Sequence, residues 1–307
     1  MLTALLCFGA VLLDRWRGEP RRWHPLVGFG ELARRVESLG HGPPELGAEA
    51  RRTRGVGAVI VLLVPFTVAA WLLAAIPLLG LAVALGLLYL AIGARSLAEH
   101  AEAVAAVLQA GDLPLAREKV AMIVSRDTAD LDEEQISRAT VESVLENGCD
   151  AIFGALFWFV LGGAAGAVLY RLANTLDAMW GYRTPRYRDF GWAAARLDDA
   201  LNWLPARLTA LSYMAVGTKP ALAWRCWREQ APGWKSSNAG SVMAAGAGAL
   251  GLALGGPARY HGEWQPRPPL GEGLAPRAED IGRAVALVRR ALGLWLGAIA
   301  LGGLILA

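Results

Sequence analysis

Cysteine and histidine are scarce in this 307-residue chain. The three cysteines, Cys7, Cys149 and Cys226, lie far apart and form no CxxC pair, so neither a disulfide framework nor a thiolate metal site is indicated. The four histidines are also scattered, and no two stand at HxxxH spacing. The sequence therefore gives no indication of a zinc site or of a disulfide-stabilised secreted domain.

Phosphate-binding loops are also missing. The chain has no GxxxxGK[ST] loop and no GxGxxG motif after a strand, which excludes a P-loop or Rossmann site. Any nucleotide must then be held by arginines, amides and carboxylate-bound metal. The net charge is only +3, and the basic residues are interleaved with acids, so nucleic acid is not an expected partner.

Charge of either sign is sparse, since 19% of residues are charged and 55% are hydrophobic. This composition is typical of an integral membrane protein. We expect an all-α, polytopic protein with about four to six membrane-embedded helices and amphipathic cytoplasmic helices. The whole chain, 1–307, is expected to form one domain.

Four uncharged runs are candidates for membrane segments. Residues 55–94 are long enough for two crossings, about 55–75 and 78–94, with Pro65, Pro77 and Gly80 available for the break. The other two runs are 151–170 and 291–307. Weaker candidates are 204–217 and 239–256, which suit buried helices or re-entrant segments, and 1–13, a retained segment that is short for a span. The Pro-rich and Gly-rich stretch 262–277 predicts an irregular connection.

The loop 14–54 contains nine arginines, so the positive-inside rule predicts that it is cytoplasmic. A two-crossing hairpin then returns residues 95–150 to the same side. If 151–170 crosses fully, residues 174–202 lie outside; if it is re-entrant, they stay inside. The sequence leaves both alternatives open.

Short polar clusters recur between residues 95 and 207. Burial of such groups beside a membrane is unfavourable in free energy unless they are paired or bind a ligand. Residues 130–147 predict an amphipathic helix, with Asp130 as N-cap and Glu133 three residues later. Arg138, Glu142, Glu146 and Asp150 recur every four residues and share one face. That face suits either Mg²⁺ or a solvated, ion-paired surface.

Three further clusters have two interpretations each. Tyr170, Asn174 and Asp177 share a helical face and suit either ligand binding or helix capping. A predicted helix 192–204, ended by Pro205, carries acids beside Arg196, which suit a metal-nucleotide or a salt-bridged surface. The segment 181–188 has the composition of a phosphate site or of a juxtamembrane basic stretch.

Taken in order, these strings resemble the CobD/CbiB family of cobalamin-biosynthesis proteins over most of the chain. The matching strings are Gly18-Glu-Pro20 with His24-Pro25, Ala94-Arg-Ser96 with His100, Ala116-Arg-Glu118, Ile123-Val-Ser-Arg-Asp-Thr128, Arg138-Ala-Thr-Val-Glu-Ser143 with Glu146-Asn147 and Asp150, Asn174-Thr-Leu-Asp177, Gly181-Tyr182, Arg186-Tyr187, Asp189-Phe-Gly-Trp192, Ala195-Arg-Leu-Asp-Asp199, Asn202 and Pro205-Ala-Arg207. Departures at Gly148-Cys149 and at Ala178 weaken any role for a hydroxyl there but leave the carboxylates untouched.

The resemblance implies an adenosylcobinamide-phosphate synthase, an ATP-dependent and Mg²⁺-dependent acid-amine ligase. Its substrates would be adenosylcobyric acid, ATP, and (R)-1-amino-2-propanol O-2-phosphate or free aminopropanol. An acyl phosphate on the corrinoid, then attacked by the amine, is the implied course. It would be a multi-pass protein of the cell inner membrane, with a site facing the cytoplasm and with other cobalamin-pathway membrane enzymes as possible partners.

For the activity that the resemblance implies, we assign each residue a role from the chemistry of its side chain. The metal candidates are Glu142, Glu146 and Asp150 first, then Asp198 and Asp199. The catalytic candidates are His100, Asp127 and Asp177. The candidates for binding substrate or nucleotide are Arg95, Arg126, Arg138, Asn147, Asn174, Arg186, Arg196, Asn202 and Arg207. The competing functions are a corrinoid transporter, whose intramembrane polar groups would line a passage, and a non-catalytic membrane sensor.

Overall fold

The computed structural model describes residues 1–20, 24–43, 45–260 and 262–305. Helices dominate these ranges, with four strands of three residues each, which confirms the all-α prediction. In the described residues four stretches are long and apolar enough to cross a membrane: Ala48–Ala74, Gly80–Gln109, Glu133–Trp180 and Ala278–Ile305. They contain the four uncharged runs apart from residues 75 and 78–79, which lie in the break between the first two stretches, and residues 306–307, which lie outside the described residues. The prediction of a polytopic membrane protein is therefore confirmed.

The chain forms two compact units, each built from separate segments. Unit 1 comprises residues 1–93, 154–203 and 299 onward, and unit 2 comprises residues 94–153 and 204–298. The single domain over 1–307 stays a prediction.

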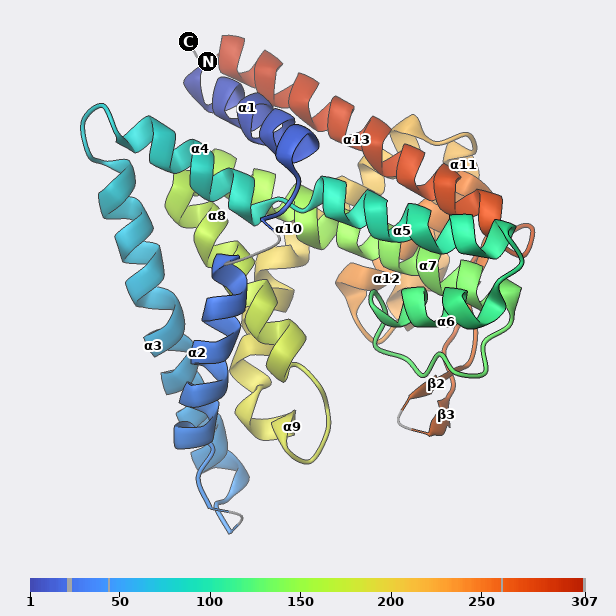
Figure 1. Cartoon of the computed structure of the whole chain (residues 1–307), viewed down its shortest axis with the longest axis horizontal. Coiled ribbons are helices and arrows are strands. Elements are labelled where there is room, and N and C mark those ends of the chain that lie inside the picture. Colours follow the sequence, from blue (N-terminus) through green and yellow to red (C-terminus); the bar gives the residue numbers. More distant parts are fainter. Residues whose placement is uncertain (21–23, 44, 261, 306–307) are drawn as a thin grey trace. The chain divides into compact units, whose positions relative to one another are not determined.

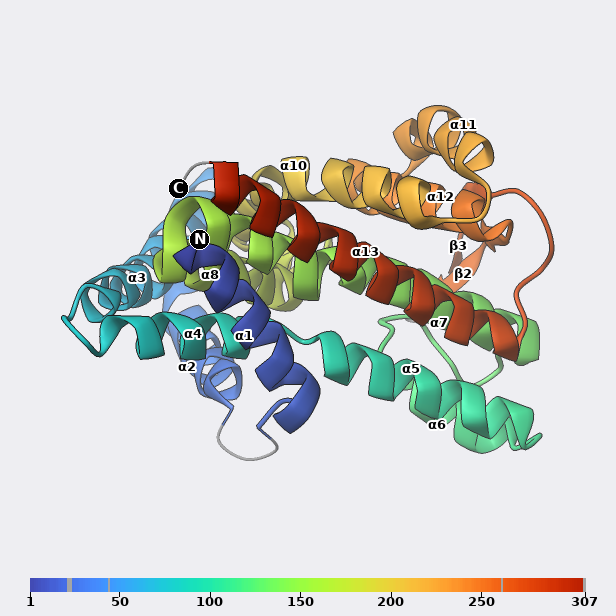
Figure 2. The same ribbon diagram turned by 90° about the horizontal axis from the view of Figure 1, so that it is seen from above.

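Helices are the regular secondary structure of the described residues of unit 1. It contains α1 (Leu2–Arg17), α2 (Pro25–Gly40), α3 (Ala48–Ala74), α4 (Gly80–Ala91), α8 (Gly154–Trp180), α9 (Tyr187–Phe190), the first part of α10 (Trp192–Val216) and the end of α13 (Ala278–Ile305). Helix α8 packs against α3 and α4, and α1 packs on α4. The two termini meet in this unit, where the N-terminal ammonium donates to the Gly303 carbonyl at 3.1 Å (Figure 2).

The predicted break in the first apolar run lies at residues 75–79, between α3 and α4. Pro77 is in the break, whereas Pro65 lies inside α3. A Cβ on Gly80 would overlap the Ala74 carbonyl, so this tight turn requires glycine. Helix α1, which covers residues 2–13 of the predicted segment 1–13, has 16 residues and is not among the four candidate spans.

The run 151–170 does not form a straight span. Gly163 has φ 57° and ψ −148°, which interrupts the helical geometry of α8. A Cβ on Gly166 would overlap the carbonyl oxygen of Trp158, and one on Gly154 would overlap the ring of Tyr170. In a straight helix these pairs would be about 12 Å and about 24 Å apart. The chain therefore folds back at Gly163 into a helical hairpin, which favours the re-entrant alternative.

Helix α10 continues through Pro205, so the prediction that this proline ends the helix is wrong. Proline lacks an N–H, and the carbonyl of Leu201, four residues earlier, therefore loses its usual helical donor. The Trp158 indole N–H donates to that carbonyl at 3.0 Å from the first arm of the α8 hairpin. This bond replaces the missing donor and lets α10 extend to Val216.

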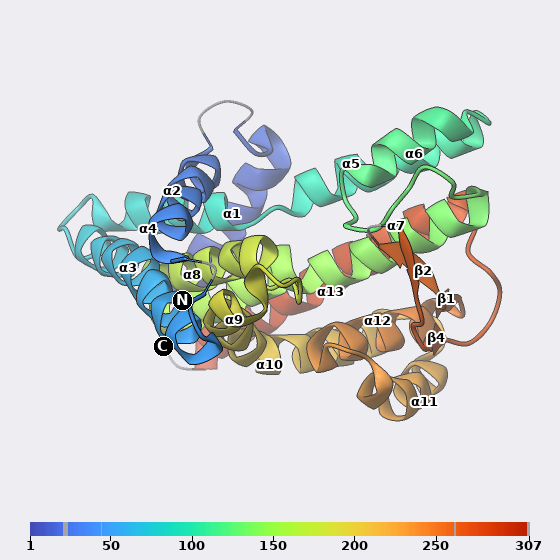
Figure 3. The same cartoon turned by 90° about the horizontal axis from the view of Figure 1, so that it is seen from below.

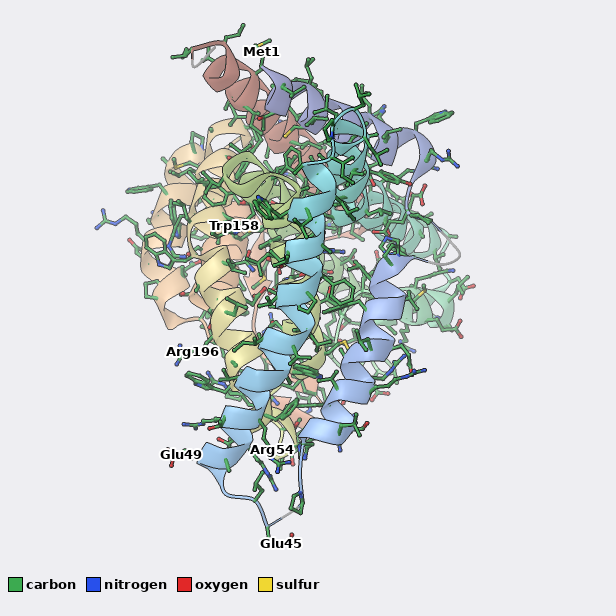
Figure 4. The ribbon with its side chains drawn as sticks, turned by 90° about the vertical axis from the view of Figure 1, so that its left-hand side faces the viewer. Met1, Glu45, Glu49, Arg54, Trp158 and Arg196 are labelled. Atoms are coloured by element: carbon green, nitrogen blue, oxygen red, sulfur yellow. The ribbon has the colours of Figure 1, made fainter. Side chains whose placement is uncertain are left out.

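Charged residues gather at one end of unit 1. Figure 4 shows α2 and α3 side by side, with Glu45, Glu49 and Arg54 at that end and Met1 at the opposite end. Segment 181–190 joins the same end through two ion pairs, Arg186 with Glu37 at 2.7 Å and Arg52 with Asp189 at 3.0 Å. The arginine-rich loop and the Arg186 segment therefore lie on the same side of the unit.

Unit 2 is built around α7 (Glu133–Gly148) and the π-helical turn that follows it, Cys149–Phe153. Helices α5 (Ala94–Gln109), α6 (Leu113–Ala121) and α12 (Ser237–Leu250) pack against α7 (Figure 1). The unit also contains α11 (Pro220–Gln230), the 3-10 turn Ala231–Gly233 and most of α13. The hydroxyl of buried Tyr213, on α10, donates to the Leu145 carbonyl at 3.0 Å and so ties α10 to α7.

Two details of the predicted helix 130–147 are wrong. The N-cap is Asp132, whose carboxylate accepts from Gln135 N at 2.8 Å while the Gln135 side chain accepts from Asp132 N at 3.0 Å, a reciprocal capping box. Asp130 instead pairs with Arg259 at 3.0 Å. Glu142 is buried on the predicted polar face, so α7 is a core helix and has no fully solvated side.

The stretch 239–256 forms the buried helix α12, which Gly251 ends in the left-handed conformation at φ 68°, and then β1 (Ala253–Gly255). The predicted irregular segment 262–277 contains β3 (Glu263–Gln265) and β4 (Pro269–Gly271), so that prediction is wrong in part. Strand β1 pairs antiparallel with β4, and β2 (Ala258–Tyr260) pairs with β3. Figure 3 shows β1 and β4 beside α12, where β4 contacts that helix.

Candidate functional site

The predicted site residues fall in both units. Unit 1 holds Asn174, Asp177, Arg186, Arg196, Asp198, Asp199 and Asn202. Unit 2 holds Arg95, His100, Arg126, Asp127, Arg138, Glu142, Glu146, Asn147, Asp150 and Arg207. Each unit brings some of these residues into one polar cluster.

The cluster in unit 1 is a carboxylate held by two amides, which we call the amide clamp: Asp198, Asn174, Asn202 and Tyr170. The Asn202 amide donates to both carboxylate oxygens of Asp198 at 3.1 Å, and the Asn174 amide lies 3.3 Å from one of them. The buried Tyr170 hydroxyl donates to the Asn202 carbonyl oxygen at 2.8 Å. That last bond fixes the orientation of the Asn202 amide, so the second arm of α8 and helix α10 position Asp198 together.

Burial raises the pKa of Asp198 from 3.8 to about 6, and the adjacent Asp199 carboxylate shifts it in the same direction, while the two amide donors oppose the shift. A carboxyl group that titrates near neutral pH can accept a proton from an amine. Mg²⁺ bound together with nucleotide phosphates needs only one or two carboxylates, which Asp198 and Asp199 can supply. The chemistry of this donor set therefore fits either role.

The other predicted residues of unit 1 lie apart from the amide clamp. The Arg186 guanidinium binds Glu37, and the exposed side chain of Arg196 lies on α10, between Trp158 and the charged end (Figure 4). Asp177 lies against Gly181, where a Cβ would overlap its carboxylate. Their predicted roles stay predictions.

The cluster in unit 2 surrounds Glu142, which is 3% exposed. One of its oxygens accepts from Arg126 and also from Arg267 at 2.7 Å, and the other accepts from Gly255 N at 2.7 Å. These donors occupy both oxygens, and among the described residues no three His, Cys, Asp or Glu side chains are placed to hold one metal ion. The structure does not assemble Glu142, Glu146 and Asp150 as metal ligands, because Glu142 is the counterion of two arginines.

Two candidate bases lie elsewhere in unit 2. His100 Nδ1 is 2.8 Å from the Ser96 carbonyl, to which it can only donate, and this leaves Nε2 as the proton acceptor. The Asp127 carboxylate accepts from Gly262 N at 2.7 Å. His100 therefore keeps an accepting nitrogen, and Asp127 anchors the turn between β2 and β3.

The remaining predicted binders of unit 2 have local partners. Asn147 donates to the Ser143 carbonyl at 2.9 Å, Arg95 pairs with Glu99 at 2.6 Å, and Arg207 donates to Asn238 at 2.6 Å. Burial lowers the pKa of Arg207. These contacts show how each side chain is held and leave its predicted role untested.

Sequence reasoning missed Arg267, which lies between β3 and β4 and contacts three other groups. Its guanidinium lies 4.8 Å from the Trp234 ring centroid, donates to the Tyr260 hydroxyl at 3.3 Å, and binds Glu142. The nearby acid and hydroxyl raise its pKa against the opposing effect of burial. Because these partners are up to 125 residues away in sequence, spacing gave no signal for them.

Unit 1 also has a cavity of about 560 Å³, lined by Leu13, Arg17, Gly18, Glu19, Pro20 and Tyr89. Its wall includes the Gly18-Glu-Pro20 string, where the Tyr89 hydroxyl donates to the Gly18 carbonyl at 2.6 Å. Nearby in sequence, His24 Nδ1 accepts from Leu26 N, and burial lowers the pKa of His24. The volume is in the range of small-molecule sites.

Comparison with known proteins gives one consistent result. The family described as CobD/Cbib protein matches residues 7–288. A protein named "Cobalamin biosynthesis protein CobD" from Chromobacterium violaceum is 64% identical over 298 residues, which cover 96% of this chain and 95% of that protein. Proteins with the same name from Stutzerimonas stutzeri and Mycobacterium tuberculosis are 56% and 41% identical, over 99% and 91% of this chain and 99% and 88% of their own lengths. No solved structure matches the chain significantly.

Proposed function

The chain belongs to the CobD/CbiB family, and we propose that it acts in cobalamin biosynthesis as an ATP-dependent acid-amine ligase. The proposed reaction joins (R)-1-amino-2-propanol O-2-phosphate, or aminopropanol, to the one free propionate of adenosylcobyric acid. The product is adenosylcobinamide phosphate, or adenosylcobinamide. The observation that carries the proposal is the family match over residues 7–288, which contains every polar cluster described above.

Amide formation from a carboxylate requires a better leaving group than hydroxide. In the proposed course a propionate oxygen attacks the γ-phosphorus of ATP, ADP leaves, and the amine then attacks the acyl carbon and releases phosphate. The amine loses one proton in the second step. The chain must therefore bind phosphate groups, stabilise negative charge on them, and accept a proton.

The amide clamp supports the proton and metal requirements. Asp198, whose pKa is raised to about 6, is suited to accept the amine proton, or to hold Mg²⁺ together with Asp199. Mg²⁺ would neutralise charge on the phosphates of ATP. The amides of Asn174 and Asn202 are of the type that hydrogen-bonds the uncharged amide groups of a corrinoid.

The arginines support the phosphate requirement. Arg126 and Arg138 lie on or beside α7, and guanidinium groups bind phosphate with paired N–H donors. We place the reaction on the side of the arginine-rich loop, which the positive-inside rule makes the cytoplasm. Other membrane enzymes of the pathway are candidate partners, because substrate and product are large polar corrinoids.

The test uses the purified full-length chain in lipid nanodiscs with adenosylcobyric acid, Mg²⁺-ATP and either amine. Mass spectrometry is expected to show the amide product, with one ADP formed per product, and no product without ATP. The variant Asn202→Ala is expected to lose activity at least tenfold, while Arg34→Ala, an exposed arginine paired with Glu31, keeps it.

Corrinoid binding without product, under conditions where both substrates are present, would contradict the ligase and favour a carrier or a sensor. ATP-dependent corrinoid movement across the membrane without amide formation would identify a transporter.

A further inference from the structure

Three arginines of unit 2 gather around the turn that follows β1, and we call them the guanidinium cluster: Arg126, Arg138 and Arg267. Arg126 and Arg267 share the Glu142 carboxylate, which also accepts from Gly255 N. The Arg138 guanidinium lies beside the next residue, Gly256, at 3.8 Å from the position of an added Cβ. The cluster thus brings a loop residue, Arg267, to two arginines that the sequence predicts as binding residues, Arg126 and Arg138.

The charges of the buried part of this cluster do not balance. The side chains of Arg126, Arg267 and Glu142 are 12%, 11% and 3% exposed, and their formal charges add up to +1. Within the described residues Arg126 has no other partner than Glu142. A nearly buried net charge is costly unless an ion of opposite sign joins it.

The cluster also has hydrogen-bond donors to spare. A guanidinium carries five N–H donors. The Nε atoms of Arg267 and Arg138 are buried and have no partner in the described residues. Arg138 uses another nitrogen to bind Glu134, and Arg267 uses its other two for Glu142 and the Tyr260 hydroxyl. Unused buried donors beside a net positive charge are suited to an oxyanion.

Two glycines shape the backbone beside the guanidinium cluster. Gly255 and Gly256 have φ of 75° and 79°, a conformation that side chains rarely adopt. A Cβ on Gly255 would overlap the Pro268 carbonyl, so β1 and the loop before β4 approach closely and bring Arg267 to Glu142. The cation–π contact with Trp234 fixes the plane of the Arg267 guanidinium.

We propose that the guanidinium cluster binds a phosphate group of a substrate, with Arg267 as a binding residue and Glu142 as the positioning residue that holds Arg126 and Arg267 together. The inference rests on the proposed function for the source of that group, which is either the nucleotide or the phosphorylated amine. Both carry the same chemistry, a phosphate dianion. A bound phosphate would balance the net charge and accept from the unused N–H donors.

The test measures ligand binding and needs no turnover. Isothermal titration of the full-length chain in nanodiscs uses two phosphorylated probes. One is a non-hydrolysable ATP analogue with Mg²⁺, and its matched probe without phosphate is adenosine. The other is aminopropanol phosphate, and its matched probe is aminopropanol. Arg267→Gln is expected to weaken one phosphorylated probe at least tenfold and to leave both matched probes unchanged. The probe that weakens identifies the source of the phosphate.

The control is Arg225→Gln, which removes an exposed arginine of the same unit, paired with Glu272, and is expected to bind all probes as the parent chain does. If Arg267→Gln does not fold, Arg267→Lys keeps the charge but not the paired donors and is expected to weaken the same probe. Glu142→Gln removes the charge that holds Arg126 and Arg267 together, so this variant is expected to weaken binding of the same phosphorylated probe and to leave both matched probes unchanged.

Parent-like affinity of folded Arg267→Gln for both phosphorylated probes would overturn the inference. Amide synthesis by that variant at the parent rate would do so as well, and the proposed function would stand. Phosphate binding that depends on Arg267 in a chain that forms no amide would instead support the inference and refute the ligase.

Discussion

Gly166→Ala tests the helical hairpin within α8. An added methyl would overlap the Trp158 carbonyl oxygen of the opposite arm, and a backbone atom cannot rotate away as a side chain can. The two arms would have to separate by on the order of 1 Å to reach ordinary contact. Overpacking of this kind costs about 1–3 kcal/mol. The same shift would weaken the bond from the Trp158 indole to the Leu201 carbonyl, adding about 1 kcal/mol.

The matched control is Gly162→Ala, four residues earlier in the same hairpin. Nothing lies within 4 Å of a Cβ at this position. Replacing a helical glycine by alanine there is expected to stabilise by up to about 1 kcal/mol. Gly166 also lies in α8, so the same gain applies to Gly166→Ala and cancels in the comparison. The free energy of unfolding, measured by tryptophan fluorescence during titration with a denaturing detergent, should therefore be lower in Gly166→Ala than in Gly162→Ala by about 2–4 kcal/mol.

Equal stability of the two variants would refute the hairpin. In a straight span both alanines would replace helical glycines, and neither would meet the opposite arm. The comparison thus separates the two topologies that the sequence left open for residues 151–170.

Three further predictions follow from unit 1. Trp158→Phe removes the N–H donor to the Leu201 carbonyl, which lacks its usual helical donor because of Pro205, and should lower the free energy of unfolding by about 1–3 kcal/mol. Trp71→Phe, at a largely exposed tryptophan, should change this free energy little. Equal effects of the two substitutions would contradict the assigned bond. Burial holds the pKa of Asp198 at about 6 in the folded chain, against 3.8 for an unperturbed aspartate. The free energy of unfolding should therefore fall by about 3 kcal/mol as pH rises from below 4 to above 6 in metal-free buffer. Asp198→Asn should abolish this fall, and an unchanged pH profile in that variant would contradict the assignment. In Arg186→Cys and Glu45→Cys, an impermeant thiol reagent should label both from the same side of the membrane, and labelling from opposite sides would contradict the packing of Arg186 on Glu37.

The features of the fold and site that depend on composition and local sequence pattern could be predicted from the sequence. The uncharged runs identified the apolar stretches, and the order of polar strings identified the family. Periodicity placed Tyr170 and Asn174 on one face of a helix, and both reach the amide clamp. These features need only short-range spacing or the hydropathy of a segment.

Prediction failed where a distant partner decides the outcome. Pro205 ends a helix by local rules, but Trp158, 43 residues from Leu201, replaces the missing donor. Glu142 has the spacing of a metal ligand, yet Arg267, 125 residues away, makes it a counterion. Asp130 has capping spacing to Glu133, but the N-cap is Asp132, and only its reciprocal hydrogen bonds with Gln135 reveal this.

The central claim is that the chain activates a corrinoid carboxylate by phosphoryl transfer from ATP. Adenosylcobyric acid labelled with ¹⁸O in its free carboxylate tests this claim directly, because the oxygen that bonds to phosphorus must leave with the phosphate when the amide forms. The account predicts that the inorganic phosphate released with each amide carries one ¹⁸O and that ADP carries none. Amide formed with unlabelled phosphate, or label recovered in AMP, would contradict it.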